Sequence, residues 1–245
     1  MTLRELRDGL RRLSDPVRAE GARRFFKTGP GEYSEGDQFL GVTVPDTRSL
    51  LSQSDALREG EVLGLLRSKW HEERLLALLI LVRRFGKAAR DEAAREHFVR
   101  LYLANTKWVN NWDLVDSSAP QILGIWLLRR VHERTVLRRF ARSKNLWEQR
   151  IAIIATQALI RDGQFDDTLR LSEHFLTHPH DLMHKACGWM LREVGNRDGA
   201  TLRNFLDQHA TQMPRTMLRY AIEKFPEPER KRYLTLRSEP PKTPS

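Results

Sequence analysis

The stretch from His71 to Leu81, HEERLLALLIL, decides the fold. It begins with polar residues and continues as an apolar run, and over residues 61–85 apolar side chains recur three and four positions apart. This spacing is typical of a helix with one buried face. No stretch of the chain alternates polar and apolar residues for long enough to indicate a strand. We therefore expect an all-α protein.

The same pattern recurs along the chain: an apolar helix, a short turn, and a second helix that begins with a polar residue. The charged residue just inside the second helix returns at intervals of about 30 to 42 residues, and the repeats of helical-pair proteins have similar lengths. The chain lacks the fixed pattern of TPR repeats, so we predict a HEAT-like helical repeat solenoid. The second helices begin HEERLLALLIL (71–81), WDLVDSSAPQILG (112–124), WEQRIAIIATQAL (147–159), LMHKACGWML (182–191) and MPRTMLRYAI (213–222).

Equivalent positions of a solenoid line up along one face. The charged residues in register are Arg74, Asp116, Arg150, Lys185 and Arg215, so four of the five positions are cationic. A ladder of cations can follow a phosphate backbone, which predicts a concave basic groove. The alternative is that these are ordinary solvated residues of a first helical turn. A cation is slightly unfavourable there because the helix dipole opposes it, which favours the groove.

The composition agrees with a polyanionic partner. Lys and Arg total 42 against 32 Asp and Glu, a net charge of +10 over 245 residues. Such an excess is most often matched by nucleic acid, although a generic Arg-rich surface would have the same count. The single cysteine, Cys187, excludes an intramolecular disulfide and a cysteine-based zinc site.

Several features bear on location and domain organisation. The N-terminus lacks the apolar core of a signal peptide, and the longest apolar run, 75–82, is too short to cross a membrane. We expect a cytoplasmic monomer without membrane contacts. We predict one solenoid domain over residues 1–226. Residues 227–245 form a polar, proline-rich tail, expected to be disordered past its first turn.

The segment TKWVNNWDLVDSSAP (106–120) carries the predicted chemistry. Asp116 occupies a position where the other repeats have a cation, and a carboxylate in a groove for DNA repels phosphate. Such a residue is better explained by chemistry than by binding. Helix capping is the alternative for both aspartates of this segment. We favour capping for Asp113 and chemistry for Asp116.

One carboxylate limits the reactions open to the site. Nucleases gather metal ions with several carboxylates, and no second acidic cluster occupies a matching position. Cleavage of a glycosidic bond requires less, because a single carboxylate can stabilise the oxocarbenium-like sugar. A purine alkylated at N3 or N7 is already cationic and leaves as a neutral molecule. Asp116 and an aromatic wall at Trp112 would then suffice, without metal or cofactor.

These residues also carry a resemblance. The segments NNWDLVDSSAPQILG, NLWEQRIAII and KACGWMLREVG resemble the AlkD-type DNA alkylation repair glycosylases over about residues 25–225. The resemblance implies excision of cationic N3- and N7-alkylpurines from duplex DNA without metal or cofactor. It places the catalytic aspartate on Asp116, the groove tryptophans on Trp112 and Trp189, and a phosphate-binding arginine on Arg150. Where it implies a tyrosine at the DNA surface, this chain offers Phe25 or Phe26.

Two further features stay open. His174, His178, His180 and His184 with Asp181 suggest either a metal site or, as we favour, a helix connection capped by Asp181. The arginine-rich run 127–145 is either a solvated helix face or a flank of the groove.

We therefore predict a DNA glycosylase of base excision repair whose partner is duplex DNA containing alkylated purines. Asp116 would stabilise the sugar cation and orient water, and Trp112 would pack beside the lesion. The rival interpretations are a non-enzymatic HEAT-like DNA-binding module, and a protein-interaction scaffold whose acidic partner mimics DNA. The predicted DNA contacts are Phe25, Arg74, Arg150, Lys185, Trp189 and Arg215.

Overall fold

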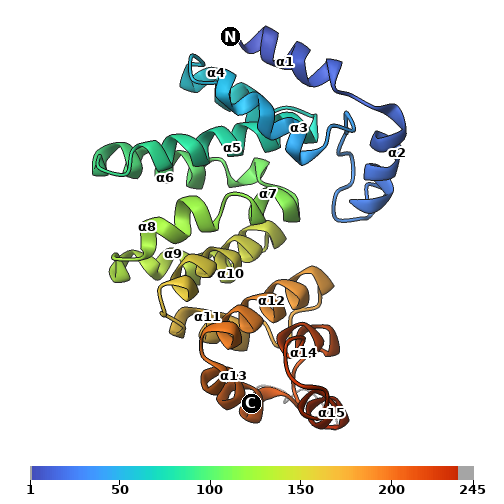
Figure 1. Cartoon of the computed structure of the whole chain (residues 1–245), viewed down its shortest axis with the longest axis vertical. Coiled ribbons are helices and arrows are strands. Elements are labelled where there is room, and N and C mark those ends of the chain that lie inside the picture. Colours follow the sequence, from blue (N-terminus) through green and yellow to red (C-terminus); the bar gives the residue numbers. More distant parts are fainter. Residues whose placement is uncertain (1, 237–245) are drawn as a thin grey trace. The chain divides into compact units, whose positions relative to one another are not determined.

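The computed structural model describes residues 2–236, and helices make up nearly all of its regular structure (Figure 1). Within these residues the only strand-like pairing is an isolated bridge between Gln38 and Trp70. The predicted all-α helical repeat fold is confirmed. Contacts divide the chain into two compact units, Met1–Ser118 and Ala119–Ser245. The sequence did not predict this division.

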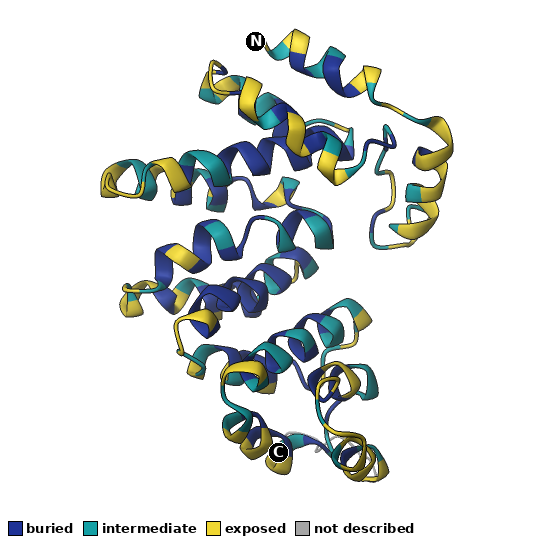
Figure 2. Cartoon of the chain, viewed as in Figure 1, coloured by how far each residue is buried: buried dark blue, intermediate teal, exposed yellow. Residues whose placement is uncertain are grey.

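The first unit is organised around helix α5 (His71–Lys87), which packs against α1, α3, α4, α6 and α7. Its residues are buried from His71 through Leu81, so this helix is dark blue over its first half in Figure 2. A helix with neighbours on several sides needs apolar residues around most of its circumference. The other helical elements of this unit are α1 (Leu3–Arg12), α2 (Pro16–Phe25), α3 (Val44–Ser49), η1 (Leu50–Gln53), α4 (Glu59–Leu66), α6 (Glu92–Ala104), η2 (Thr106–Trp108) and α7 (Trp112–Asp116).

The second unit is built on two long helices, α10 (Leu146–Arg161) and α12 (Asp181–Arg197). Helix α12 packs between α10 and α14 (Arg215–Ala221), so second helices of successive repeats lie side by side as the repeat pattern predicts. The remaining elements are η3 (Pro120–Gly124), α8 (Ile125–Leu127), η4 (Val131–Arg134), α9 (Thr135–Ala141), α11 (Asp166–His174), α13 (Gly199–His209) and α15 (Glu227–Thr235).

The predicted starts of the five second helices all lie within two residues of the observed starts of α5, α7, α10, α12 and α14. One of them differs in length. The segment predicted as one helix from residue 112 ends at Asp116, and a π-helical turn follows at Pro120–Gly124. Proline has no backbone N–H and cannot continue an α-helical hydrogen-bond ladder, which explains the interruption. Asp116 therefore ends a short helix instead of lying near the start of a long one.

The segment after residue 226 begins with an ordered helix. Helix α15 covers Glu227–Thr235, and the buried Tyr233 donates a hydrogen bond from its hydroxyl to Asp207 at 3.0 Å. The expectation of disorder past the first turn is wrong for this helix, because Tyr233 supplies an apolar anchor that the polar composition hides. Residues 237–245 of the predicted tail lie outside the described residues. Within 2–236, no helix is both long and apolar enough to span a bilayer.

Close helix packing in the second unit depends on Gly188. A Cβ atom at this position would lie 2.5 Å from both the carbonyl oxygen of Met217 and the Cβ of Tyr220 on α14. We expect Gly188→Ala to lower the free energy of unfolding by about 1–3 kcal/mol, because α12 and α14 would have to separate. Urea denaturation followed by circular dichroism measures this change.

The matched control is Gly64→Ala, since a Cβ at this helical glycine would meet nothing within 4 Å. Alanine in a helix is favoured over glycine by roughly 0.5–1 kcal/mol, so this variant should be as stable as wild type or more so. Equal stability of the Gly188→Ala protein and wild type would contradict the close packing.

Candidate active site

Helix α7, which carries Trp112 and Asp116, begins at the buried residue Asn111. The Asn111 side chain accepts a hydrogen bond from the Trp112 backbone N–H at 2.8 Å and donates one to the Ser34 hydroxyl at 2.6 Å. Asn111 is thus the N-cap of α7 and also ties the helix to the segment around Ser34. The capping role predicted for Asp113 is wrong, because this carboxylate contacts another helix.

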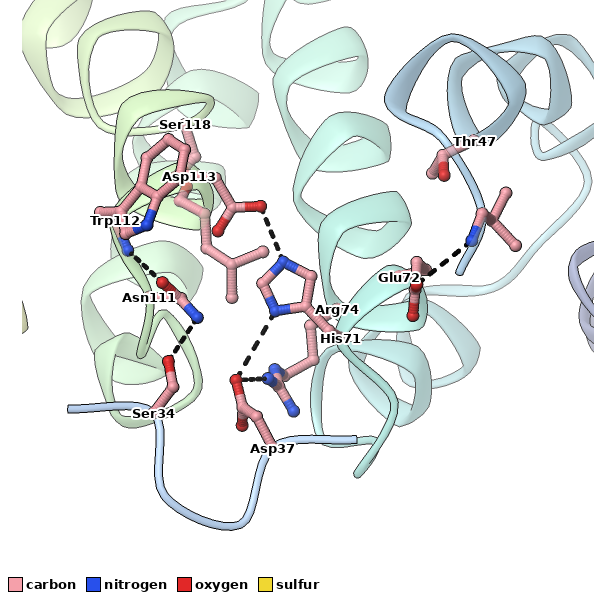
Figure 3. Close-up of polar contacts among 12 residues, drawn as sticks. Ser34, Asp37, Thr47, His71, Glu72, Arg74, Asn111, Trp112, Asp113 and Ser118 are labelled. Carbon is pink, nitrogen blue, oxygen red and sulfur yellow. Dashed lines mark hydrogen bonds and ion pairs between the residues drawn. The ribbon is translucent and has the colours of Figure 1, made fainter. Parts of the chain in front are cut away.

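The Asp113 carboxylate meets His71, the first residue of α5. Asp113 Oδ2 lies 2.7 Å from His71 Nε2, and on the other side of the ring His71 Nδ1 lies 3.6 Å from Asp37 Oδ2 (Figure 3). Arg74 Nη2 donates to the same Asp37 oxygen at 2.7 Å. The His71 side chain is only 3% exposed. We call Asp37, His71, Arg74 and Asp113 the buried charge cluster.

The protonation of this cluster follows from its surroundings. Burial alone would lower the pKa of His71, but the charge of Asp113 and the contacts with Asp113 and Asp37 outweigh it and raise the pKa to about 9. Burial alone would raise the pKa of Asp37, but His71 and Arg74 hold it below its usual value. At neutral pH the imidazole is therefore a cation, and two positive groups face two carboxylates.

The two residues that follow His71 fix other segments. The Glu72 carboxylate accepts backbone N–H bonds from Leu40, Gly41 and Val42 at 2.9, 2.8 and 3.3 Å. Gly41 has φ 77°, and a Cβ there would lie 2.2 Å from the Asp15 carbonyl oxygen, so this turn requires glycine. Glu73, also buried, pairs with Arg7 of α1 at 3.0 Å. Each charge at the start of α5 thus binds a segment distant in sequence.

An aromatic stack adjoins the cluster. The Phe26 ring stacks on Phe39 and on Trp112, with ring centroids 5.0 and 5.3 Å apart, and also lies 5.0 Å from the His71 ring. Phe25 meets Trp112 edge-on at 5.9 Å and is 64% exposed. Phe25 is therefore the exposed end of the stack. Trp112, which Phe25 contacts, is half-buried.

Asp116 is the last residue of α7 and is half-buried. Because it follows Trp112 by four positions, the two side chains share one face of the helix. The buried Tyr102 hydroxyl bonds with Ser118 at 3.1 Å, and burial together with the negative charge of Asp116 raises the pKa of Tyr102. Structure thus brings Phe25, Trp112 and Asp116 to one region of the first unit.

Of the predicted phosphate contacts, Arg74 lies in the interior. It is 3% exposed, and its guanidinium donates to Asp37 and, at 3.0 Å, to the Ser68 carbonyl oxygen. This placement does not support a phosphate contact, because its charge already compensates that of Asp37.

The other predicted phosphate contacts, Arg150, Lys185 and Arg215, belong to the second unit, as does Trp189. Arg150 is 5% exposed and donates to the Leu182 carbonyl oxygen at 2.8 Å. Lys185 is more accessible and pairs with Asp181 at 2.8 Å, one turn earlier on α12. Arg215 donates to the Leu234 carbonyl oxygen at 2.7 Å, and the Trp189 indole donates to Glu193 at 3.1 Å.

The histidine-rich connection is a structural turn. The His180 ring accepts the Leu182 backbone N–H at 3.1 Å and caps α12, so the capping role predicted for Asp181 is wrong. His178 in turn contacts Gln149 at 2.9 Å. Across residues 2–236, no group of three His, Cys, Asp or Glu side chains is placed to hold a metal ion.

The arginine-rich run is partly structural as well. Arg134 is buried, pairs with Asp167 at 3.0 Å and donates to the Leu127 carbonyl oxygen. The Arg130 guanidinium lies 3.5 Å from the centre of the Trp126 ring. These two residues therefore stabilise the second unit. The sequence interpretations, a solvated helix face or a flank of the groove, did not predict this role.

Sequence reasoning missed His71, Asp37 and Glu72. One signal could have found the first and third: HEER opens a helix that the apolar pattern already predicts to be buried. Buried charges require partners, so four consecutive polar residues there indicate a network. The partners themselves come from distant segments and leave no local pattern.

The fold defines an all-α helical repeat protein, and the short helix α7 carries its aromatic and acidic candidate site. The chain belongs to the DNA alkylation repair enzyme family, whose model matches residues 6–225. A solved structure, a predicted DNA alkylation repair enzyme from Enterococcus faecalis, is 16% identical with a TM-score of 0.67, covering 87% of this chain and 97% of that one. At this identity the likeness supports the fold alone. Comparison with curated protein sequences finds no significant match.

The buried charge cluster makes stability depend on pH. The pKa of His71 is raised from 6.5 to about 9, so its contribution to folding is complete below pH 6.5 and is lost as pH rises through 9. We expect the free energy of unfolding to fall over this range by up to about 3 kcal/mol. Urea titrations at pH 6, 7.5 and 9 measure this fall.

The control is His71→Gln, which has no titrating group at this position and should lack this part of the pH dependence. The same loss of stability between pH 6.5 and 9 in wild type and His71→Gln would show that another group is responsible.

Proposed function

We propose that this protein is a DNA glycosylase that excises cationic N3- and N7-alkylated purines from duplex DNA. Its family gives it a role in DNA alkylation repair, and DNA as its partner. The observation that supports the reaction is the pairing of Trp112 and Asp116 on one face of α7, beside the exposed ring of Phe25. This arrangement offers an aromatic surface and one carboxylate to a cationic lesion.

In the proposed reaction the bond between C1′ of the deoxyribose and N9 of the N3- or N7-alkylated purine breaks. The bonding electrons leave with the base, which becomes neutral, and positive charge develops on the sugar. The Asp116 carboxylate stabilises this charge and orients the water whose oxygen then bonds to C1′, and the proton that this water loses passes to solvent. No acid is needed to protonate the base, so one carboxylate is a sufficient catalytic set.

The sharpest test is Asp116→Asn. We expect single-turnover release of alkylpurine from methylated duplex DNA to fall by about 10²-fold or more, the usual scale for one preorganised electrostatic group. DNA affinity should hold or rise, because a charge that repels phosphate is gone. Chromatography of released bases gives the rate, and circular dichroism of the same protein reports its folding.

Asp113→Asn is not a neutral control, because Asp113 pairs with His71. Asp91→Asn is better: Asp91 caps α6 by accepting the Ala94 backbone N–H at 2.9 Å, and asparagine caps helices equally well. This variant should excise at the wild-type rate. Excision at that rate by folded Asp116→Asn would exclude the mechanism and favour a non-enzymatic DNA-binding module.

We propose further that Lys185 contacts the DNA backbone. Each phosphate contact contributes about 0.9 to the slope of log K against log salt, so Lys185→Gln should lower the slope by about that amount on damaged and undamaged duplexes alike. Fluorescence anisotropy with labelled duplex at several salt concentrations measures it.

Lys231→Gln is matched to this variant. Lys231 pairs with Glu227 one turn earlier on α15 at 2.7 Å, as Lys185 pairs with Asp181 at 2.8 Å. The control should keep the wild-type slope. Equal slopes for Lys185→Gln and Lys231→Gln would remove Lys185 from the interface.

A further inference from the structure

The orientation of helix α7 depends on contacts from outside the helix. It has only five residues, and so short a helix has few hydrogen bonds of its own. Two polar contacts reach it from other segments near its start: the hydrogen bond from Asn111 to Ser34, and the contact between Asp113 and His71. Trp112 lies between these two anchor residues in sequence, and Asp116 follows Asp113 by three positions.

We propose that His71 is a positioning residue of the candidate site. Through its contact with Asp113 it holds α7, and with it Trp112 and Asp116, in the orientation that base excision requires. This inference rests on the proposed function of the site.

The two carboxylates beside His71 are not equivalent. Asp37, from the segment before α3, is also bound by Arg74. Asp113, from α7, has only His71: its Oδ1 is buried and has no hydrogen-bond partner within the described residues. Two other charged groups line the same cavity as His71 and Asp113. Glu72 accepts hydrogen bonds from three backbone amides, and Arg18 donates to the Gly41 carbonyl oxygen and pairs with Asp15. A neutral His71 would therefore leave the Asp113 carboxylate, which is 14% exposed, without a contacting cation, which is unfavourable because its Oδ1 is buried.

This asymmetry gives the inference a signature in pH. His71 loses its proton near pH 9, and Asp113 then loses the cation that anchors α7. The single-turnover rate of base release should fall with a midpoint near pH 9. The contact with Asp37 helps to raise the pKa of His71, so Asp37→Asn should move this midpoint to lower pH. A purely structural role would change stability without moving the midpoint.

The experiment combines this rate profile with a measurement that needs no activity. In the wild-type chain, NMR titration follows the His71 ring and the Trp112 indole N–H, the latter assigned with Trp112→Phe. We expect both signals to shift with one midpoint near pH 9, and the Trp112 shift to vanish in His71→Gln. At pH 7, His71→Gln should release alkylpurine at least tenfold more slowly than wild type.

The control is His97→Gln. His97 also pairs with a carboxylate, Glu59 at 2.6 Å, but on the exposed surface, and its replacement should change neither the rate nor the Trp112 signal. A Trp112 signal that ignores the titration of His71, or an unmoved rate midpoint in Asp37→Asn, would overturn the inference. If His71→Gln fails to fold, the NMR titration of the wild-type protein still tests whether Trp112 responds to His71. Failure of wild type to release any base would refute the proposed function instead, and the Trp112 titration would still test the positioning.

Discussion

Charges at the start of helix α5 point into the interior of the first unit, and the rest of that unit is arranged around the partners they need. A buried ionised group is tolerated only when it is paired or fully hydrogen-bonded. Glu72 is satisfied by three backbone amides, Glu73 by Arg7, and His71 and Arg74 by Asp37 and Asp113. Each requirement fixes one segment, so the charges determine which pieces of chain meet at α5.

This explains how segments without much regular structure hold their place. Residues 26–43 contain no helix, yet they carry Phe26, Asp37 and the turn at Gly41. Their anchors are the carboxylate of Glu72, the buried charge cluster and the hydrogen bond from Asn111 to Ser34. The aromatic stack of Phe26, Phe39 and Trp112 is thus held by polar contacts of its neighbouring residues.

The helices could be predicted from sequence, because burial at helical spacing leaves a periodic pattern at every repeat. Comparing repeats also singled out Asp116 as an aspartate at a position that is otherwise cationic. The caps were harder: Asn111 and His180 cap where aspartates were expected, since an aspartate near a helix start can equally serve a partner elsewhere. Arg74 pairs with Asp37, and Asp113 pairs with His71. The partner is in each case far away in sequence, so the pairing leaves no local pattern.

Proline at position 120 has a consequence for evolution. Because α7 stops early, Asp116 lies at the carbonyl end of a helix, where a negative charge is disfavoured. Selection for stability alone would disfavour an aspartate at this position. An engineer who optimises this chain for heat resistance by helix rules would therefore be directed first to Asp116, the residue to which we assign the proposed chemistry.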